Sequence, residues 1–395
     1  PCRRATVLAG EIAGLNVVDI INEPTAATLA WAWMKGQLGG GSNSRPRTIL
    51  LYDLGGGTFD VTVVRYTPTD FRVLGTDGDT FLGGLDWTNR LVDYVATRFQ
   101  RKYKIDPREN PATRYALTCY CERAKQTLSE KPRSGVQVVA GGHRMTVGIS
   151  QQEFEELTAD LVQRTRDTTE LVLEFCGISA SDLDDVVLVG GSTSLPAVKD
   201  MLEDLFGRPP CTDLDPRLAV AQGAAIHAAI LEAGQAGRKS RMGQAIIERL
   251  KSIRTTDVNS HSLGVVITDP SNPRRERNHI MIPRNSTLPA ESRQRFVTTV
   301  GSPSGIRIRL LEGEASDVLA CTAIGDIRIT ELPENLPAGS PVEVLYRYDD
   351  RRCIQVSARE LTGASEASVR IVWEGMASED ATTRFRRLAR DYHVE

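Results

Sequence analysis

A run of three glycines between two carboxylates is the first place in the sequence with the residue types for phosphate chemistry. Gly55, Gly56 and Gly57 are consecutive, and Asp53 and Asp60 stand on either side of them. Without Cβ atoms, the backbone N–H groups of such a turn can approach and donate to a polyphosphate. An aspartate beside it can hold a hydrated Mg²⁺ ion. A plain hairpin turn explains the same glycines equally well, so this motif alone does not decide.

A second glycine loop follows a predicted buried strand over residues 185–189. Gly190, Gly191 and Ser192 come directly before a helix predicted over residues 195–206. Backbone amides and the helix dipole at such a junction favour anions. Two glycine loops, each at the end of a strand, predict one nucleotide held between them.

One predicted helix carries polar side chains on a single face. Glu122 and Lys125 are three residues apart, and Ser129 lies one turn further on. A solvated helix face explains this spacing as well, and only the two glycine loops favour a binding role. The Gly83 and Gly84 pair precedes another predicted helix, where ordinary helix capping is a sufficient explanation.

The elements that must position these residues alternate between strands and helices in the first part of the chain, which predicts an α/β fold. Hydrophobic periodicity predicts helices over residues 6–18, from about Pro24, and over 85–103, 111–129, 151–176, 195–206 and 218–233. Runs rich in β-branched residues predict strands over residues 48–52, 59–66, 71–76, 136–140, 143–149 and 185–189.

The composition changes after residue 231. Residues 232–256 carry six Lys and Arg against two Glu and are predicted to be a linker. From residue 257 to 376, short β-branched runs separated by Pro, Gly and Asn predict eight strands of an all-β sandwich or barrel. Residues 377–395 resemble the start of a solvated helix.

Composition excludes several classes of protein. The chain has 395 residues, with 48 Lys and Arg against 51 Asp and Glu, so bulk charge gives no attraction to nucleic acid or to an anionic membrane. No apolar run approaches the length of a membrane-spanning helix. Seven scattered cysteines predict a reducing, cytoplasmic compartment. Neither the cysteines nor the five histidines show metal-binding spacing.

Several longer motifs resemble one family. The sequences INEPTAATLAW, LYDLGGGTFDVTVV, GDTFLGGLDW, CERAKQTLS, VVLVGGSTSLPAVK and DPRLAVAQGAAIHAAIL resemble, in order, the nucleotide-binding domain of the DnaK-type 70-kDa heat-shock chaperones. SHSLGVV, IPRNSTLPAESRQRF, IRIRLLEGE and CIQVSARE resemble their peptide-binding domain. The resemblance covers residues 3–376.

The resemblance implies a layout and a set of ligands. It implies a partial actin-like ATPase domain, mainly its second lobe, over residues 1–231, a linker over 232–256, a β-sandwich peptide-binding domain over 257–376 and the start of a helical lid or tail over 377–395. The implied cofactors are ATP or ADP with Mg²⁺. The implied partners are unfolded, hydrophobic polypeptide segments and J-domain and nucleotide-exchange co-chaperones, with no nucleic acid and no membrane.

Family roles carry over to individual residues where the motifs match. The catalytic positions are Glu23, Asp53 and Asp60, of which the two aspartates also hold the metal. The nucleotide positions are Gly55, Gly56, Gly57, Thr58, Glu122, Lys125, Ser129, Gly190, Gly191 and Ser192. The peptide positions are Val265, Phe296, Ile306, Ile308 and Tyr348, for which membership of the plain sandwich core is the alternative.

The sequence departs from the family pattern at five positions and at its start. Phe81, Leu85, Gln126, Ser194 and Arg217 replace residues that are commonly His, Glu, Arg, Arg and Asp. The family's first phosphate loop and a lysine linked to hydrolysis have no counterpart, so we expect an N-terminally truncated, lid-less member with negligible turnover by itself. Residues 253–258 replace an apolar linker, so we also expect peptide binding that is uncoupled from nucleotide.

The resulting hypothesis is an ATP-dependent molecular chaperone that captures and releases unfolded segments. A degenerate holdase that binds peptide without hydrolysing ATP is the alternative. A sugar kinase or actin-type ATPase would share the nucleotide fold, but the predicted β-sandwich argues against both.

Overall fold

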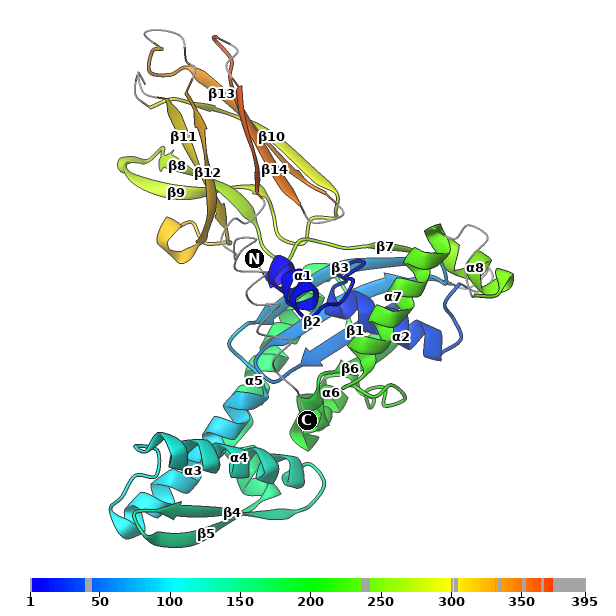
Figure 1. Ribbon diagram of the computed structural model, residues 1–395, viewed down its shortest axis with the longest axis vertical. Helices are drawn as coiled ribbons and strands as arrows, with labels where there is room; N and C mark the ends of the chain where they lie inside the picture. The colour runs from blue at the N-terminus through cyan, green and yellow to red at the C-terminus, as the bar shows by residue number, and fades with distance from the viewer. Residues whose placement is uncertain are drawn as a thin grey trace. The chain divides into compact units, whose positions relative to one another are not determined.

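The computed structural model of the chain (Figure 1) describes residues 2–39, 45–235, 242–299, 301, 305–330, 332, 336–349, 353–363 and 366–371. These residues form two compact units, one of residues 21–255 and one that combines residues up to 20 with those from 256 onward. The predicted tail, residues 377–395, lies outside the described residues. Within the described part, no helix is long and apolar enough to cross a membrane.

A five-stranded sheet organises the unit of residues 21–255. Its order is β6 (Asp185–Val189), β1 (Arg47–Leu54), β2 (Phe59–Tyr66), β3 (Asp70–Asp79) and β7 (Arg254–Thr256). β1 runs antiparallel to β2 and parallel to β6, with Asp53 opposite Val189. Because β1 and β6 are parallel, the turns that follow them leave from the same edge of the sheet.

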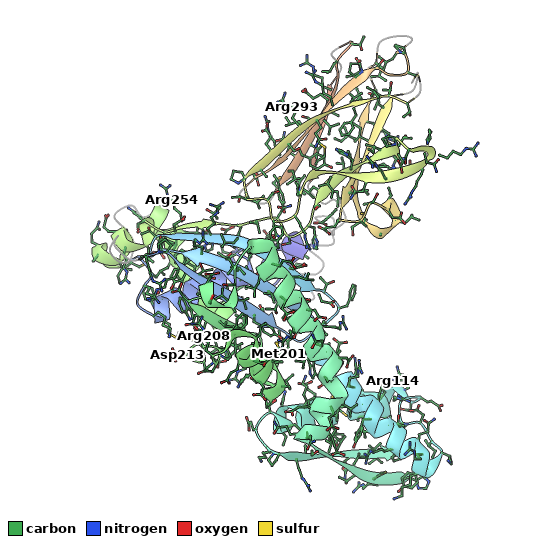
Figure 2. All side chains as sticks on the ribbon, turned by 180° about the vertical axis from the view of Figure 1, so that it is seen from behind. Arg114, Met201, Arg208, Asp213, Arg254 and Arg293 are labelled. Atoms are coloured by element: carbon green, nitrogen blue, oxygen red, sulfur yellow. The ribbon has the colours of Figure 1, made fainter. Side chains whose placement is uncertain are left out.

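Helices cover both faces of this sheet. α2 (Glu23–Met34) and α7 (Ala219–Gln235) lie on one face, and the long α5 (Gln151–Cys176) crosses the other, as Figures 1 and 2 show from opposite sides. The helices α2 and α7 can approach closely because Gly223 has no side chain. A Cβ at this position would lie 1.8 Å from the Ala26 carbonyl oxygen. The short turn η1 (Ala180–Asp182) precedes β6, and the short turn η2 (Gly191–Ser194) connects β6 to helix α6 (Pro196–Phe206).

A smaller layer is built from α3 (Gly84–Tyr103), α4 (Pro111–Leu128) and the hairpin of β4 (Arg133–Ala140) and β5 (His143–Ser150). Its buried side chains, such as Leu91, Phe99 and Leu128, belong to the same hydrophobic core as Leu50 and Tyr52 of β1. Helix α5 packs on α3 as well as on β2 and β3, so it joins this part of the unit to the sheet (Figure 1).

The second unit contains two four-stranded antiparallel sheets. One has the order β10 (Ala290–Val297), β13 (Pro341–Tyr348), β14 (Ile354–Glu360) and β15 (Glu366–Ile371). The other has the order β12 (Thr322–Ile329), β11 (Ile306–Glu312), β8 (Leu263–Asp269) and β9 (Asn272–Ile282), with the turn η3 (Val318–Ala320) before β12. A shared core and a hydrogen bond from the Tyr346 hydroxyl to the Gly264 carbonyl join the sheets face to face.

The first helix is shorter than predicted. The periodic pattern predicts a helix over residues 6–18, whereas α1 (Cys2–Ile12) ends six residues earlier. Gly14 has a left-handed φ of 81°, and the Leu15 amide donates to the Gly10 carbonyl. This is the hydrogen-bonding pattern of a glycine-terminated helix, which apolar spacing alone does not reveal.

The predicted linker contains regular structure. Residues 236–241 of it lie outside the described part, but α8 (Gln244–Lys251) and β7 follow. The Arg254 amide donates to the Thr69 carbonyl at 2.8 Å, and Ile253 is buried. An edge strand pairs through its backbone and needs no apolar side chains, so the polar residues of β7 are compatible with this pairing.

Candidate functional site

Both predicted glycine loops lie at one edge of the five-stranded sheet. Gly190 follows β6 with a φ of 85°, and a Cβ there would lie 2.3 Å from the Leu54 carbonyl oxygen at the end of β1. The Gly190 amide donates to the Pro216 carbonyl at 3.0 Å. Only glycine allows this approach in this conformation, so the second loop is packed directly against the end of the strand that carries the first.

The first loop is held in place by Gly83 and Gly84, for which helix capping alone was a sufficient explanation from the sequence. Within the loop, the Gly55 amide donates to the Thr58 carbonyl at 3.0 Å. The Gly84 amide donates to the Gly55 carbonyl at 3.0 Å, and a Cβ on Gly83 would lie 2.4 Å from the Gly57 amide nitrogen. The two consecutive glycines before a helix could have indicated a close contact from the sequence. That this contact is with the loop of residues 55–57 is seen only in the structure.

Three carboxylates gather beside the first loop. Asp53 and Asp60 are opposite each other on β1 and β2, and Glu23 stands at the start of α2. Burial, and then the charges of Glu23 and Asp60, raise the pKa of Asp53 to about 7. A partly buried group of like charges is an arrangement that a bound cation stabilises.

The donor set fits a hydrated Mg²⁺ ion better than a fully protein-coordinated metal. Among the described residues, no three His, Cys, Asp or Glu side chains are grouped closely enough to hold a metal ion by themselves. Mg²⁺ commonly uses only one or two carboxylates together with water and phosphate oxygens. Asp53 and Asp60 provide that number of carboxylates next to the exposed Gly56, Gly57 and Thr58.

Helix α4 places an ion pair against the same loops. The Lys125 ammonium group is 7% exposed and donates to the Gly84 carbonyl at 2.7 Å and to Glu122 Oε2 at 2.8 Å. The Thr88 hydroxyl also donates to Glu122 Oε2, at 2.6 Å. Burial opposes the charged form of Glu122, but the hydrogen bonds from Lys125 and Thr88 prevail and lower its pKa. Thr88 was not predicted, because nothing in its sequence neighbourhood indicates this contact.

The second loop joins the same assembly through Ser192. Its hydroxyl donates to the Gly55 carbonyl at 2.9 Å, and a Cβ on Gly84 would lie 2.2 Å from that hydroxyl and 3.1 Å from Lys125 Nζ. The Ser129 hydroxyl, at the end of α4, donates to the Lys125 carbonyl of its own helix. The predicted residues of both loops and of α4 are thus brought together, with Ser129 at the periphery.

The residues that depart from the family pattern lie around this assembly. Gln126 donates to Glu122 Oε1 at 3.1 Å. Arg217 forms two hydrogen bonds with Asp215, one of them at 3.0 Å, and its side chain is 74% exposed. None of these interactions is part of the packing that joins the two loops.

A cleft of about 810 Å³ opens in the β-sandwich. Four of the five predicted peptide-binding residues line it, namely Val265, Phe296, Ile306 and Ile308. Val342 and Val344 of β13 also line it and were not predicted. The cleft is therefore apolar where strands of both sheets meet.

Phe296 is the half-buried aromatic side chain of this cleft. Its ring packs edge-on against His279, with centroids 5.4 Å apart, and His279 Nε2 is 2.6 Å from Gln294 Oε1. Tyr348 is not among the lining residues, since it lies at the other end of β13 opposite Ala290. The structure does not bring Tyr348 to the cleft.

Comparison with known proteins gives a consistent result. Residues 2–395 match the family described as Hsp70 protein. The chain is 36% identical over 377 residues to "Chaperone protein DnaK" of Deinococcus deserti, covering 93% of this chain and 56% of that protein. It is 34% identical over 376 residues to the protein of the same name from Halobacterium salinarum, covering 93% and 55%. The chain spans about half the length of the curated relatives it matches.

Proposed function

The chain belongs to the Hsp70 family, and on that premise we propose that it acts in a molecular chaperone that binds extended, hydrophobic segments of unfolded polypeptides. The observation that carries the proposal is the apolar cleft of the sandwich, with Phe296, Ile306 and Ile308 in its lining. Burying an aliphatic side chain of a client there would contribute about 1.5–3 kcal/mol. Main-chain hydrogen bonds to an extended segment would add affinity without selecting sequence.

We propose that adenine nucleotide binds at the edge where the two glycine loops meet. The backbone amides of residues 56–58 and 191–192 would receive the phosphates and the adenosine part, with Glu122 and Lys125 beside the latter. Asp53 and Asp60 would hold Mg²⁺, which neutralises phosphate charge when bound. Glu23 would position water next to them. Nucleotide-dependent capture and release, J-domain and nucleotide-exchange partners and a cytoplasmic location belong to the same proposal.

Strand β7 provides a physical basis for coupling in this proposal. β7 is hydrogen-bonded to β3, and β3 ends at Asp79, shortly before the Gly83 and Gly84 pair that contacts the first glycine loop. A change at the phosphate loop can therefore reach β7 through one strand. In the intact protein, nucleotide binding would alter the pairing of β7, and through it the affinity for peptide.

The peptide-binding part is tested by fluorescence anisotropy with a labelled apolar heptapeptide. Phe296→Ala should weaken binding roughly tenfold or more, as loss of a central aromatic contact typically does. Leu319→Ala is the matched control, because Leu319 is 93% exposed and does not line the cleft. Equal affinity of the wild-type chain and the Phe296 variant would refute the assignment of the cleft. Calorimetric titration with Mg-ADP, compared between wild type and Asp60→Asn, tests the nucleotide part.

A further inference from the structure

The rim of the sandwich cleft is rich in arginine. Arg295 of β10 and Arg307 and Arg309 of β11 line the cleft, and their side chains are 74%, 56% and 38% exposed. In β11, alternation directs Ile306 and Ile308 toward the core and these arginines away from it. The cleft thus has an apolar floor and a guanidinium rim.

The hairpin between β8 and β9 extends this positive surface. Arg274 and Arg275 are exposed and directly follow Pro273, which lines the cleft. Hydrogen bonds from Ser271, and then the charges of Arg277 and Arg275, hold the pKa of the cleft-lining Asp269 below its usual range. Arg275 stands between Pro273 and Glu276, which both line the cleft, and is therefore close to the cleft wall.

The carboxylates at the rim are fewer than the arginines and are shared between them. Asp326 lies 2.5 Å from a nitrogen of Arg307 and 4.0 Å from one of Arg328. One carboxylate cannot neutralise two guanidinium groups, so positive charge remains on this side of the cleft.

The same holds on the opposite sheet. Glu343 pairs with Arg293, labelled in Figure 2, at 3.1 Å and with Arg295 at 3.6 Å. On the first sheet, Arg309 of β11 forms a one-to-one ion pair with Glu276 of β9. Among the described residues, two carboxylates, Asp326 and Glu343, are thus shared by four arginines of the sandwich, namely Arg293, Arg295, Arg307 and Arg328.

We propose that the cleft selects extended segments whose apolar core is flanked by acidic residues. This inference rests on the proposed peptide-binding function and specifies its client class. The apolar floor binds the core of the segment, while aspartate or glutamate on either side pairs with the surplus guanidinium groups of the rim. Basic flanks meet like charge there and are disfavoured.

The test uses three labelled peptides with one Leu- and Ile-rich core and flanks of Asp, Ser or Lys. In anisotropy titrations at low salt, the Asp-flanked peptide should bind roughly three- to tenfold more tightly than the Lys-flanked one, as expected for a few exposed ion pairs. The difference should shrink in 0.5 M NaCl, since the Debye length falls to about 4 Å. The Ser-flanked peptide should lie between the two.

Charge variants assign the preference to the rim. Arg274→Gln with Arg275→Gln should reduce the preference to about twofold, because two exposed charges are lost. Arg347→Gln is the matched control. Arg347 lies in the same sandwich, pairs with Glu291 and is five residues along β13 from Val342, which is roughly 17 Å away at the usual rise per residue. It should leave the preference unchanged.

The outcomes separate this inference from the proposed function. Equal affinity for the three peptides, or tighter binding of the Lys-flanked one, overturns the selection of acidic flanks and leaves peptide binding intact. Failure of all three peptides to bind overturns the peptide-binding function and this inference with it. If a labelled single-stranded oligonucleotide binds in an Arg274- and Arg275-dependent manner while the peptides show no preference, the rim serves nucleic acid and the inference is wrong.

Discussion

Replacing Asp53 with Asn should stabilise the nucleotide-free protein above neutral pH. Asp53 has a folded-state pKa of about 7 against an ordinary 3.8, first because it is partly buried and then because Glu23 and Asp60 are close. Between these two pH values the folded state retains a proton that the unfolded state has released, so the free energy of unfolding falls as pH rises. An amide at this position carries no charge at any pH and avoids that loss.

The magnitude follows from the same numbers. At about 1.4 kcal/mol per pKa unit, the rise from 3.8 to about 7 gives an upper limit of about 4 kcal/mol. Because Asp53 is only partly buried, solvent screening reduces this to about 2 kcal/mol. The gain of the Asp53→Asn variant over wild type should be fully developed near pH 8 and absent near pH 4.

Urea unfolding followed by tryptophan fluorescence measures the free energy of unfolding of the compact unit that contains Asp53, residues 21–255. Trp31 and Trp87 are both buried within residues 21–255. Asp160→Asn is the control, since Asp160 is an exposed partner of Arg90 and should leave the pH dependence unchanged. The reasoning is refuted if Asp53→Asn and wild type lose stability in parallel between pH 5 and 8.

Three further changes test the packing of the site and the edge strand. Gly190→Ala should destabilise the protein by about 2 kcal/mol or more, because φ is 85° and the new Cβ would clash with backbone; an unchanged melting temperature would contradict this. Lys125→Met should cost about 3 kcal/mol, measured by urea unfolding, since Glu122 would lose its buried partner, and Lys125→Met with Glu122→Gln should recover part of it. Arg254→Pro, but not Arg254→Ala, should speed amide exchange in the neighbouring strand by removing the donor to Thr69; identical exchange in both variants would argue against a paired β7.

Strands and loops with a local signature were predictable from sequence. β2 (Phe59–Tyr66) and β6 (Asp185–Val189) match the predicted spans because a run of β-branched residues identifies a buried strand. The glycine loops were predictable because consecutive glycines at the end of a strand usually mark a tight turn or a close approach of the backbone to another group. The parallel pairing of β1 with β6 places both loops at one edge of the sheet.

Contacts between distant segments were not predictable in the same way. Gly83 and Thr88 acquire their roles from Gly57 and Glu122, which lie far away in sequence. β7 pairs through backbone groups that every residue carries, so its side chains give no signal for this contact. Tyr348 has the right residue class for a cleft but sits at the far end of its strand, where only the register with Ala290 reveals its place.

The close packing of glycines around the two loops limits how the site can change during evolution. Gly83, Gly84 and Gly190 each face atoms less than 3.0 Å from where a side chain would begin, so almost any replacement displaces a loop. Substitutions are tolerated more easily at positions outside that packing. The five departures from the family pattern agree with this, since all are exposed side chains, namely Phe81, Leu85, Gln126, Ser194 and Arg217. The exposed residues around the two loops can therefore change while the glycine framework stays fixed.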